Sequence, residues 1–447
     1  MSVIEKKEEF EAFFHDAAKP RDRWRVGTEY EKVGIERSTA KAVPYFGRRG
    51  VEFILRELID RYGWKPEEQA GHIIALARGN AQITLEPGGQ IELSGEPCES
   101  IHCTYAEFTQ HTRELLEVTD PLGVVFLGLG MQPVSRLEEI EWVPKKRYRI
   151  MAPYMLKVGK LGRRMMKQTA TVQANIDYGD EKDAMAKFRT GMGLTPILIA
   201  MFANSPISEG QLNGYRSFRE HIWTDTDKQR SGLLKFAFSP NVTFAHYVEY
   251  ALDVPMYFII RNHDYIDMTS VTFRQFFERG HHGERATIED WNDHLTTLFP
   301  ETRIKRYLEV RSADSQPPEL MPALPAIIKG TFYDSDCLQA AWDLVKGWSW
   351  DERMQVYLDS HRQALASRIR RYSLFDLAKE LFQIAWEGLR RQKALNSQGE
   401  DETIYLNPLK NLLLQGKCPA DVIVEKWEGE LQRDIKKLIA YSAYKLT

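Results

Sequence analysis

Five segments that lie far apart in the chain have the period of β-strands, and each carries carboxylates or amides on one of its two faces. Successive side chains of a strand point to opposite faces, so Glu29 and Glu31 of the segment 26–35 share the face opposite to Tyr30. The polar positions of the five segments are Glu29 and Glu31; Gln82, Thr84 and Glu86; Gln90, Glu92 and Ser94; Thr171, Gln173, Asn175 and Asp177; and Tyr307, Glu309 and Arg311. The chain therefore has to build a sheet with a strongly acidic side.

For any one of these segments, a half-buried strand with an ordinary solvent side is the commoner interpretation. Glutamate is depleted in strands, however, and like charges that face each other across a sheet destabilise it, so several acidic segments require a compensating cation. Magnesium fits, because it prefers oxygen ligands and is commonly held by carboxylates together with nucleotide phosphates. Glu29 and Glu31 lie roughly 6 to 7 Å apart by strand rise, a span that two neighbouring ions can share. The pattern alone leaves metal–phosphate chemistry and ordinary strands equally open.

The composition of the chain argues against several other classes of protein. The 447 residues have a formal net charge of -3, with 28% charged and 43% hydrophobic residues, which is typical of a soluble globular protein and gives no reason to expect a nucleic-acid partner. The longest apolar stretches, such as 124–129 and 196–203, are far shorter than the roughly 18 to 20 residues that cross a bilayer, so no membrane partner is expected. The acidic start lacks the pattern of a signal peptide, and the four cysteines are too few for a disulfide scaffold. We therefore expect a cytoplasmic protein.

The kind of periodicity changes along the chain. Strands and helices mix in the first part, whereas the remainder shows helical spacing over 351–368, 373–391 and 420–441. This change predicts an α+β catalytic domain over 1–333 and a helical C-terminal region, 334–447, packed on it.

Two further clusters are less specific. The basic run Lys145-Lys146-Arg147, with Arg149, suggests a phosphate or nucleic-acid patch, although a solvated helix face is the commoner interpretation. His281-His282 has no further ligands at a known metal spacing.

Several longer runs resemble those of a known family. They are Gly27-Thr28-Glu29-Tyr30-Glu31-Lys32; Leu85-Glu86-Pro87-Gly88-Gly89-Gln90-Ile91-Glu92-Leu93-Ser94-Gly95; Phe126-Leu127-Gly128-Leu129-Gly130-Met131-Gln132-Pro133; His221-Ile222-Trp223-Thr224-Asp225-Thr226-Asp227; and Arg306-Tyr307-Leu308-Glu309-Val310-Arg311. In this order they resemble glutamate-cysteine ligase, in the plant-type branch that many bacteria share. The resemblance covers about residues 22–333 and is weaker through the helical tail.

The resemblance implies an α+β fold whose antiparallel sheet curls into a funnel related to glutamine synthetase, with ATP and magnesium at its glutamate-lined mouth. The implied reaction joins the γ-carboxylate of L-glutamate to the amino group of L-cysteine through γ-glutamyl phosphate, the first step of glutathione biosynthesis. Phosphoryl transfer asks the protein mainly for positioning and charge neutralisation.

The same resemblance implies two or three Mg²⁺ ions. Their expected ligands are Glu29, Glu31, Glu86, Glu92, Gln173 and Glu309. Arg311 shares a strand face with Glu309 and is expected to contact the transferring phosphoryl group; a simple ion pair with Glu309 is the other interpretation. The expected substrate-binding residues are Arg149, Thr171, Arg216, Arg219 and Trp223. Structural ion pairs compete as an explanation for the three arginines, and a core position competes for Trp223.

Two departures from the family concern regulation and the pocket rim. The position of the redox-sensitive plant cysteine is held here by Tyr105, with Cys98 and Cys103 out of register, so disulfide regulation is not expected. The loop 280–289 is shorter than in relatives. Other amine acceptors, or a non-catalytic nucleotide- or metal-binding role, stay open as alternatives, as does the choice between monomer and homodimer.

Overall fold

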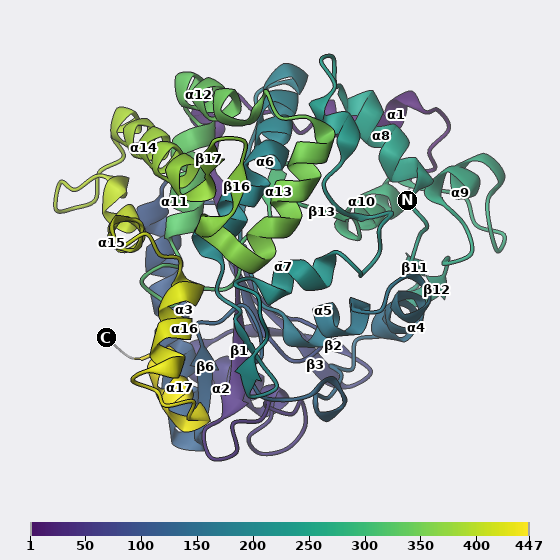
Figure 1. Cartoon of the computed structure of the whole chain (residues 1–447). Coiled ribbons are helices and arrows are strands. Elements are labelled where there is room, and N and C mark those ends of the chain that lie inside the picture. Colours follow the sequence, from purple (N-terminus) through teal and green to yellow (C-terminus); the bar gives the residue numbers. More distant parts are fainter. Residues whose placement is uncertain (1, 446–447) are drawn as a thin grey trace.

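A nine-stranded sheet forms the centre of the computed structural model, which describes residues 2–445 (Figure 1). Its strands are β1 (Val26–Glu36), β2 (Lys65–Gln69), β3 (His72–Arg78), β4 (Ala81–Leu85), β5 (Ile91–Ser94), β6 (Val124–Leu127), β7 (Val172–Ile176), β14 (Thr302–Ile304) and β15 (Leu308–Val310). They follow the order β14-β15-β7-β1-β5-β4-β3-β2, and β6 pairs with the far half of β1. Every pairing in this sheet is antiparallel, which confirms the predicted α+β class.

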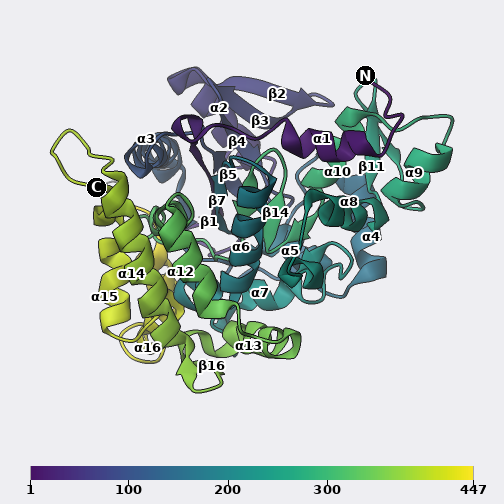
Figure 2. The same ribbon diagram turned by 90° about the horizontal axis from the view of Figure 1, so that it is seen from above.

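Helices surround this sheet (Figures 1 and 2). They are α1 (Glu8–His15), α2 (Val51–Tyr62), α3 (Ile101–Thr119), α4 (Tyr148–Val158), α5 (Gly162–Gln168), α6 (Glu181–Phe202), α7 (Phe218–Trp223), α8 (Phe244–Asp253), α9 (Phe273–Arg279), α10 (Ile288–Thr296), α11 (Ala323–Phe332), α12 (Ser335–Val345), α13 (Trp350–Gln363), α14 (Leu374–Gln392), α15 (Asn407–Leu414), α16 (Pro419–Glu428) and α17 (Ile435–Ser442). Small two-stranded pairs complete the fold: β8 (Ile207–Ser208) with β9 (Gln211–Leu212), β10 (Ser231–Gly232) with β13 (Phe299–Pro300), β11 (Phe258–Arg261) with β12 (Asp264–Asp267), and β16 (Arg368–Ile369) with β17 (Tyr372–Ser373). None of the helices within residues 2–445 has the length and apolar character needed to cross a bilayer.

Both faces of β1 are covered. On one face, Tyr30 packs against Phe108 of α3 with ring centroids 4.8 Å apart. On the opposite face, Glu31 is only 7% exposed, and Glu92 of the neighbouring strand has the same exposure. The interpretation of an ordinary solvent side is therefore wrong for these two glutamates.

Strand register brings the polar positions of the five segments together. Glu31 lies opposite Glu92 on β5, and Glu29 lies opposite Gln173 on β7. Glu309 on β15 lies opposite Asn175, one strand further along the sheet. Because opposite residues of an antiparallel pair share a face, these side chains form one continuous polar surface.

The C-terminal helices α11 to α15 share the main hydrophobic core with the sheet domain, whereas α17 and most of α16 pack in a second cluster with β1 and β6. α14 packs against α11 and α6, and the backbone N–H of Tyr444 donates to Phe126 O on β6. The boundary at residue 333 stays a prediction. The helix predicted over 420–441 is two helices, α16 and α17, because the chain turns between them, where Gln432 and Arg433 have positive φ.

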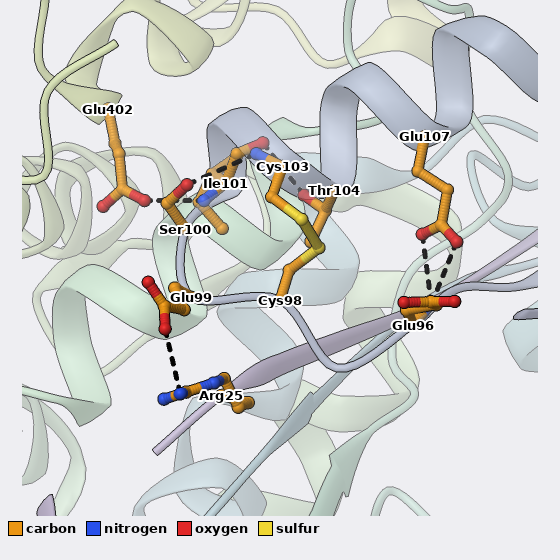
Figure 3. The surroundings of a disulfide bond; sticks show 10 residues. All are labelled: Arg25, Glu96, Cys98, Glu99, Ser100, Ile101, Cys103, Thr104, Glu107 and Glu402. Atoms are coloured by element: carbon orange, nitrogen blue, oxygen red, sulfur yellow. Dashed lines mark hydrogen bonds and ion pairs between the residues drawn. A yellow bond between two sulfur atoms is a disulfide. The ribbon is translucent and has the colours of Figure 1, made fainter. Parts of the chain in front are cut away.

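Two cysteines form a bond that the sequence did not predict. Cys98 and Cys103 are joined by a disulfide with a Cα–Cα separation of 5.8 Å, whereas Cys337 and Cys418 are free and buried (Figure 3). Cys98 pairs through its backbone with Val26 at the start of β1, and Cys103 lies in the first turn of α3. The disulfide thus joins a residue that pairs with the start of β1 to the first turn of the helix that covers one face of β1.

Candidate active site

A cavity of about 170 Å³ opens on the polar side of the sheet. Its lining residues are Glu29, Glu31, Glu86, Pro87, Glu92, Arg147, Tyr148, Met151, Met165, Met166, Thr169, Thr171, Gln173, Arg219, Trp223, Phe258, Thr296, Thr297, Phe299, Arg303 and Arg311. Four glutamates and four arginines therefore meet in one small space, drawn from segments that lie far apart in the chain.

Three of the glutamates converge most closely. Glu31, Glu86 and Glu92 each offer a carboxylate oxygen, and these oxygens lie within 4.8 Å of one another. Glu86 reaches the other two because the chain turns directly after β4, at Gly88 and Gly89. The turn requires small residues: Gly89 has a φ of +85°, and a Cβ on Gly88 would lie 2.3 Å from Lys167 O.

The buried carboxylates lie in a setting that disfavours their ionisation. Burial and the neighbouring Glu86 and Glu92 raise the pKa of Glu31 well above its usual value. Burial, with Glu86, also raises the pKa of Glu92, and burial with Glu309 and Glu92 raises the pKa of Glu29 to about 7. A hard divalent cation bound to all three oxygens of the cluster would remove this repulsion, so the donor set fits magnesium.

A second group lies beside the first along the sheet. Asn175 Nδ2 donates to Glu29 Oε1 at 3.1 Å, and Arg311 Nη1 donates to Gln173 Oε1 at 2.8 Å. Glu29 and Gln173 both line the cavity and offer it further oxygen atoms. The structure thus brings five of the six predicted metal ligands to the cavity wall.

Glu309, the sixth predicted ligand, lies behind this wall with no solvent exposure. Arg303 Nη2 contacts both of its oxygens at 2.7 and 2.8 Å, Lys305 Nζ lies 2.9 Å from Oε2, and Arg311 also pairs with it. Burial alone would raise the pKa of Glu309, but these three cations together hold it well below the usual value. Both interpretations of Arg311 receive support: it pairs with Glu309, and it lines the cavity.

The predicted substrate-binding residues divide into two sets. Arg219, Thr171 and Trp223 line the cavity, as expected. Arg216 lies outside the lining and pairs with Asp421 at 2.6 Å, which is the competing interpretation of that residue. Arg149 is exposed on α4 and is also absent from the lining. Arg149 and Arg216 therefore do not line this cavity, and their role in substrate binding stays a prediction.

Arg147 occupies the place that we expected for Arg149. It lines the cavity, and its Nε is buried without a hydrogen-bond partner in the described part of the chain, while Nη2 donates to Tyr148 Oη at 3.3 Å. It belongs to the basic run noted in the sequence, so that run was a usable signal. An arginine with a donor that lacks an acceptor, beside this cavity, is suited to bind a carboxylate.

The apolar part of the cavity wall was not predicted from the sequence. Met151, Met165, Met166 and Phe258 also line the cavity. Polarizable thioethers and an aromatic ring are suitable neighbours for an uncharged, sulfur-containing side chain.

An antiparallel sheet covered by helices, with carboxylates and arginines converging on a cavity in its polar face, has the features of an α+β enzyme. Comparison with known proteins identifies the family: residues 25–437 match glutamate-cysteine ligase family 2 (GCS2), and the chain belongs to it.

Its relatives include glutamate–cysteine ligase B, chloroplastic, of Oryza sativa subsp. japonica, which is 43% identical over 432 residues, covering 96% of this chain and 85% of the relative. The chloroplastic glutamate–cysteine ligase of Arabidopsis thaliana is 43% identical over 427 residues, covering 95% and 80%. A crystal structure of the Francisella tularensis glutamate–cysteine ligase in complex with AMP has a TM-score of 0.53 at 12% identity, covering 95% of this chain and 90% of that one. At this identity the last comparison shows a shared fold only.

The names of the relatives correct one expectation. Those from rice, Brassica juncea and Arabidopsis are all named chloroplastic, which contradicts the predicted cytoplasmic location.

Proposed function

We propose that this protein joins the γ-carboxylate of L-glutamate to the amino group of L-cysteine, with conversion of ATP to ADP and phosphate, as the first step of glutathione biosynthesis. Family membership supports the reaction class. The observation that carries the chemistry is the convergence of Glu31, Glu86 and Glu92 within 4.8 Å, next to Arg311 in the same cavity.

We further propose that Glu31, Glu86 and Glu92 hold one Mg²⁺, and that Glu29 with Gln173 contributes to a second. Bound magnesium would neutralise the charge of the ATP phosphates during phosphoryl transfer. Glu309 is an additional ligand candidate only if an ion displaces one of its three cationic partners.

The arginines of the cavity have separate tasks in this proposal. Arg311, held by Glu309 and Gln173, stabilises the charge that develops on the transferring phosphoryl group. Its rigid anchoring means that no reorganisation is needed as the charge develops. Arg147 and Arg219 are the proposed clamps for the carboxylates of the amino-acid substrates, since both line the cavity.

A carboxylate is a poor acyl donor, so transfer of the γ-phosphoryl group of ATP to the γ-carboxylate of glutamate comes first. The cysteine amine then attacks the carbonyl carbon of γ-glutamyl phosphate, and phosphate leaves. The wall formed by Met151, Met165, Met166 and Phe258 is the proposed place for the cysteine side chain, because it is apolar and contains polarizable sulfur.

ADP release by purified protein tests this proposal. With ATP, Mg²⁺, L-glutamate and L-cysteine present, release should require every component, and γ-glutamylcysteine should form in equal amount. Release that does not depend on cysteine but responds to another amine in a panel would instead support the alternative acceptor. Absence of ADP release under all of these conditions would instead support the non-catalytic, nucleotide- or metal-binding role.

A further inference from the structure

A second cavity, of about 420 Å³, lies between the segment that precedes β1, the first half of α6 and α12. α6 and α12 lie side by side in both overall views (Figures 1 and 2). This cavity shares no lining residue with the candidate active site. Its volume lies within the range of roughly 300 to 1,000 Å³ that is usual for small-molecule sites.

The charge of this cavity is unbalanced. Arg21, Lys182 and Arg189 line it, together with one carboxylate, Asp183. That carboxylate already has a partner outside the lining, because Lys187 Nζ lies 2.8 Å from Asp183 Oδ2. Within residues 2–445, no ion pair joins any of the three lining cations to a carboxylate. The cavity therefore has an excess of positive charge.

Arg189 is the most informative of these cations. Its Nε is buried and has no hydrogen-bond partner in the described part of the chain. Since the guanidinium of Arg189 makes no side-chain hydrogen bond or ion pair within residues 2–445, it is suited to bind an anion that enters the cavity. The guanidinium carbon lies 4.9 Å from the ring centroid of Trp342, which fixes the guanidinium plane next to an aromatic wall.

Aromatic side chains form much of that wall. Trp24, Tyr333 and Trp342 all line the cavity, and Trp24 packs against Tyr333 with ring centroids 4.8 Å apart. Aromatic faces favour planar ring systems by offset stacking. A ligand that satisfies both the cations and the rings has to combine an anionic group with a planar ring.

We propose that this cavity is a second binding site, for a small organic anion that carries a phosphate or a carboxylate on a planar ring. The anionic group binds Arg189 and Lys182, and the ring contacts Trp342 and Trp24. Arg189 is the residue on which affinity depends most, since its free Nε, its charge and its contact with Trp342 all serve the same ligand.

Calorimetric titration with four probes tests the site: phenyl phosphate, benzoate, inorganic phosphate and benzyl alcohol. Phenyl phosphate or benzoate should bind the wild-type protein at least roughly tenfold more tightly than either probe that lacks the ring or the charge. Arg189→Gln should weaken this binding at least roughly tenfold, and Trp342→Leu should also weaken it. Binding of the ring-bearing phosphate but not of benzoate, or the reverse, identifies which anion the site accepts.

The matched control is Arg371→Gln. Arg371 also lies 4.9 Å from an aromatic ring, that of Tyr372, but outside both cavities, so this variant should bind as the wild type does. Arg189→Gln should retain its ADP release and its unfolding temperature, which separates loss of this site from loss of the fold or of the proposed ligase activity. Absence of binding by the wild type in the millimolar range, or equal affinity in the wild type and Arg189→Gln, would overturn the proposal.

Discussion

Glu31 on β1 and Glu92 on β5 lie directly opposite each other in an antiparallel pair, with carboxylate oxygens within 4.8 Å. Each is 7% exposed, and burial together with neighbouring glutamates raises the pKa of both. A sheet does not normally place two buried carboxylates in this way without a cation between them. The pair therefore gives the metal-binding proposal its most direct structural support.

The first prediction concerns stability against pH and magnesium. A glutamate whose pKa is higher in the folded than in the unfolded state binds more protons when folded, so stability falls as pH rises from the unfolded value through the folded one. For Glu29 this window runs from 4.5 to about 7, and the pKa values of Glu31 and Glu92 are raised in the same direction. Between pH 6 and pH 8 the contribution of Glu29 to the unfolding free energy of metal-free protein should fall by about 1 kcal/mol, measured as the difference between wild type and Glu29→Gln. This difference is needed because burial lowers the pKa of Lys32 and that of Lys145 to about 7, and these two lysines change stability in the opposite direction.

Magnesium should reverse this loss, because it binds the ionised carboxylates. Thermal unfolding should show a larger gain on adding Mg²⁺ at pH 8 than at pH 6, and Glu92→Gln should reduce that gain. Exposed Glu99, which pairs with Arg25, gives the control variant Glu99→Gln (Figure 3). An equal gain at both pH values would contradict the prediction.

The second prediction concerns Glu309. Glu309→Gln removes the anion that three cations surround, so turnover should fall at least roughly tenfold and unfolding free energy should fall by roughly 3 to 5 kcal/mol. Because Glu309 is proposed to hold Arg311 in place and not to bind metal, Glu309→Gln should not change the Mg²⁺ concentration that gives half-maximal ADP release. A marked rise in that concentration would instead make Glu309 a metal ligand, and wild-type turnover would remove it from both roles.

The third prediction compares two arginines that are two residues apart. Arg147→Met should raise the KM for an amino-acid substrate at least roughly tenfold, because a clamp for its carboxylate is lost. Arg149→Met should leave KM and kcat within about twofold, since this side chain is exposed on α4 and absent from the cavity wall. Steady-state ADP release with each substrate varied in turn measures both. The opposite pattern would restore Arg149 as the substrate contact.

The fourth prediction concerns the disulfide. Replacing both Cys98 and Cys103 by serine should lower the unfolding free energy by roughly 2 kcal/mol, the amount expected for so short a loop. Labelling of thiols in unfolded protein should find two more free cysteines after reduction than before it, those of the Cys98–Cys103 pair. Replacing the free, buried Cys337 by serine is the control, and this variant should show the same difference between reduced and oxidised protein. If no such difference exists in wild-type protein, the bond does not form in solution.

The strands and the polar face of the sheet were predictable, because a period of two assigns every side chain of a strand to one face. The convergence of Glu31 and Glu92 follows from the register of β1 against β5. The choice between Arg147 and Arg149 was not predictable, because both lie at the start of α4 and successive helical residues turn by about 100°. Only the packing of α4 decides which of the two lines the cavity.

Two features of the backbone were not predictable from the sequence either. Helical periodicity over 420–441 was correct, yet the break between α16 and α17 depends on residues with positive φ that periodicity does not report. The Cys98–Cys103 bond likewise depends on the turn between the backbone pairing of Cys98 with Val26 and the first turn of α3. Both features arise where tertiary contacts set the backbone.

Anomalous diffraction from crystals soaked with Mn²⁺ and a non-hydrolysable ATP analogue tests the central claim most directly. A manganese peak is expected between the carboxylate oxygens of Glu31, Glu86 and Glu92, at roughly 2 Å from each. Loss of that peak in Glu92→Gln crystals, with Glu99→Gln crystals unchanged, would confirm the assignment. A cavity that binds the nucleotide analogue but shows no manganese among these three glutamates would contradict it.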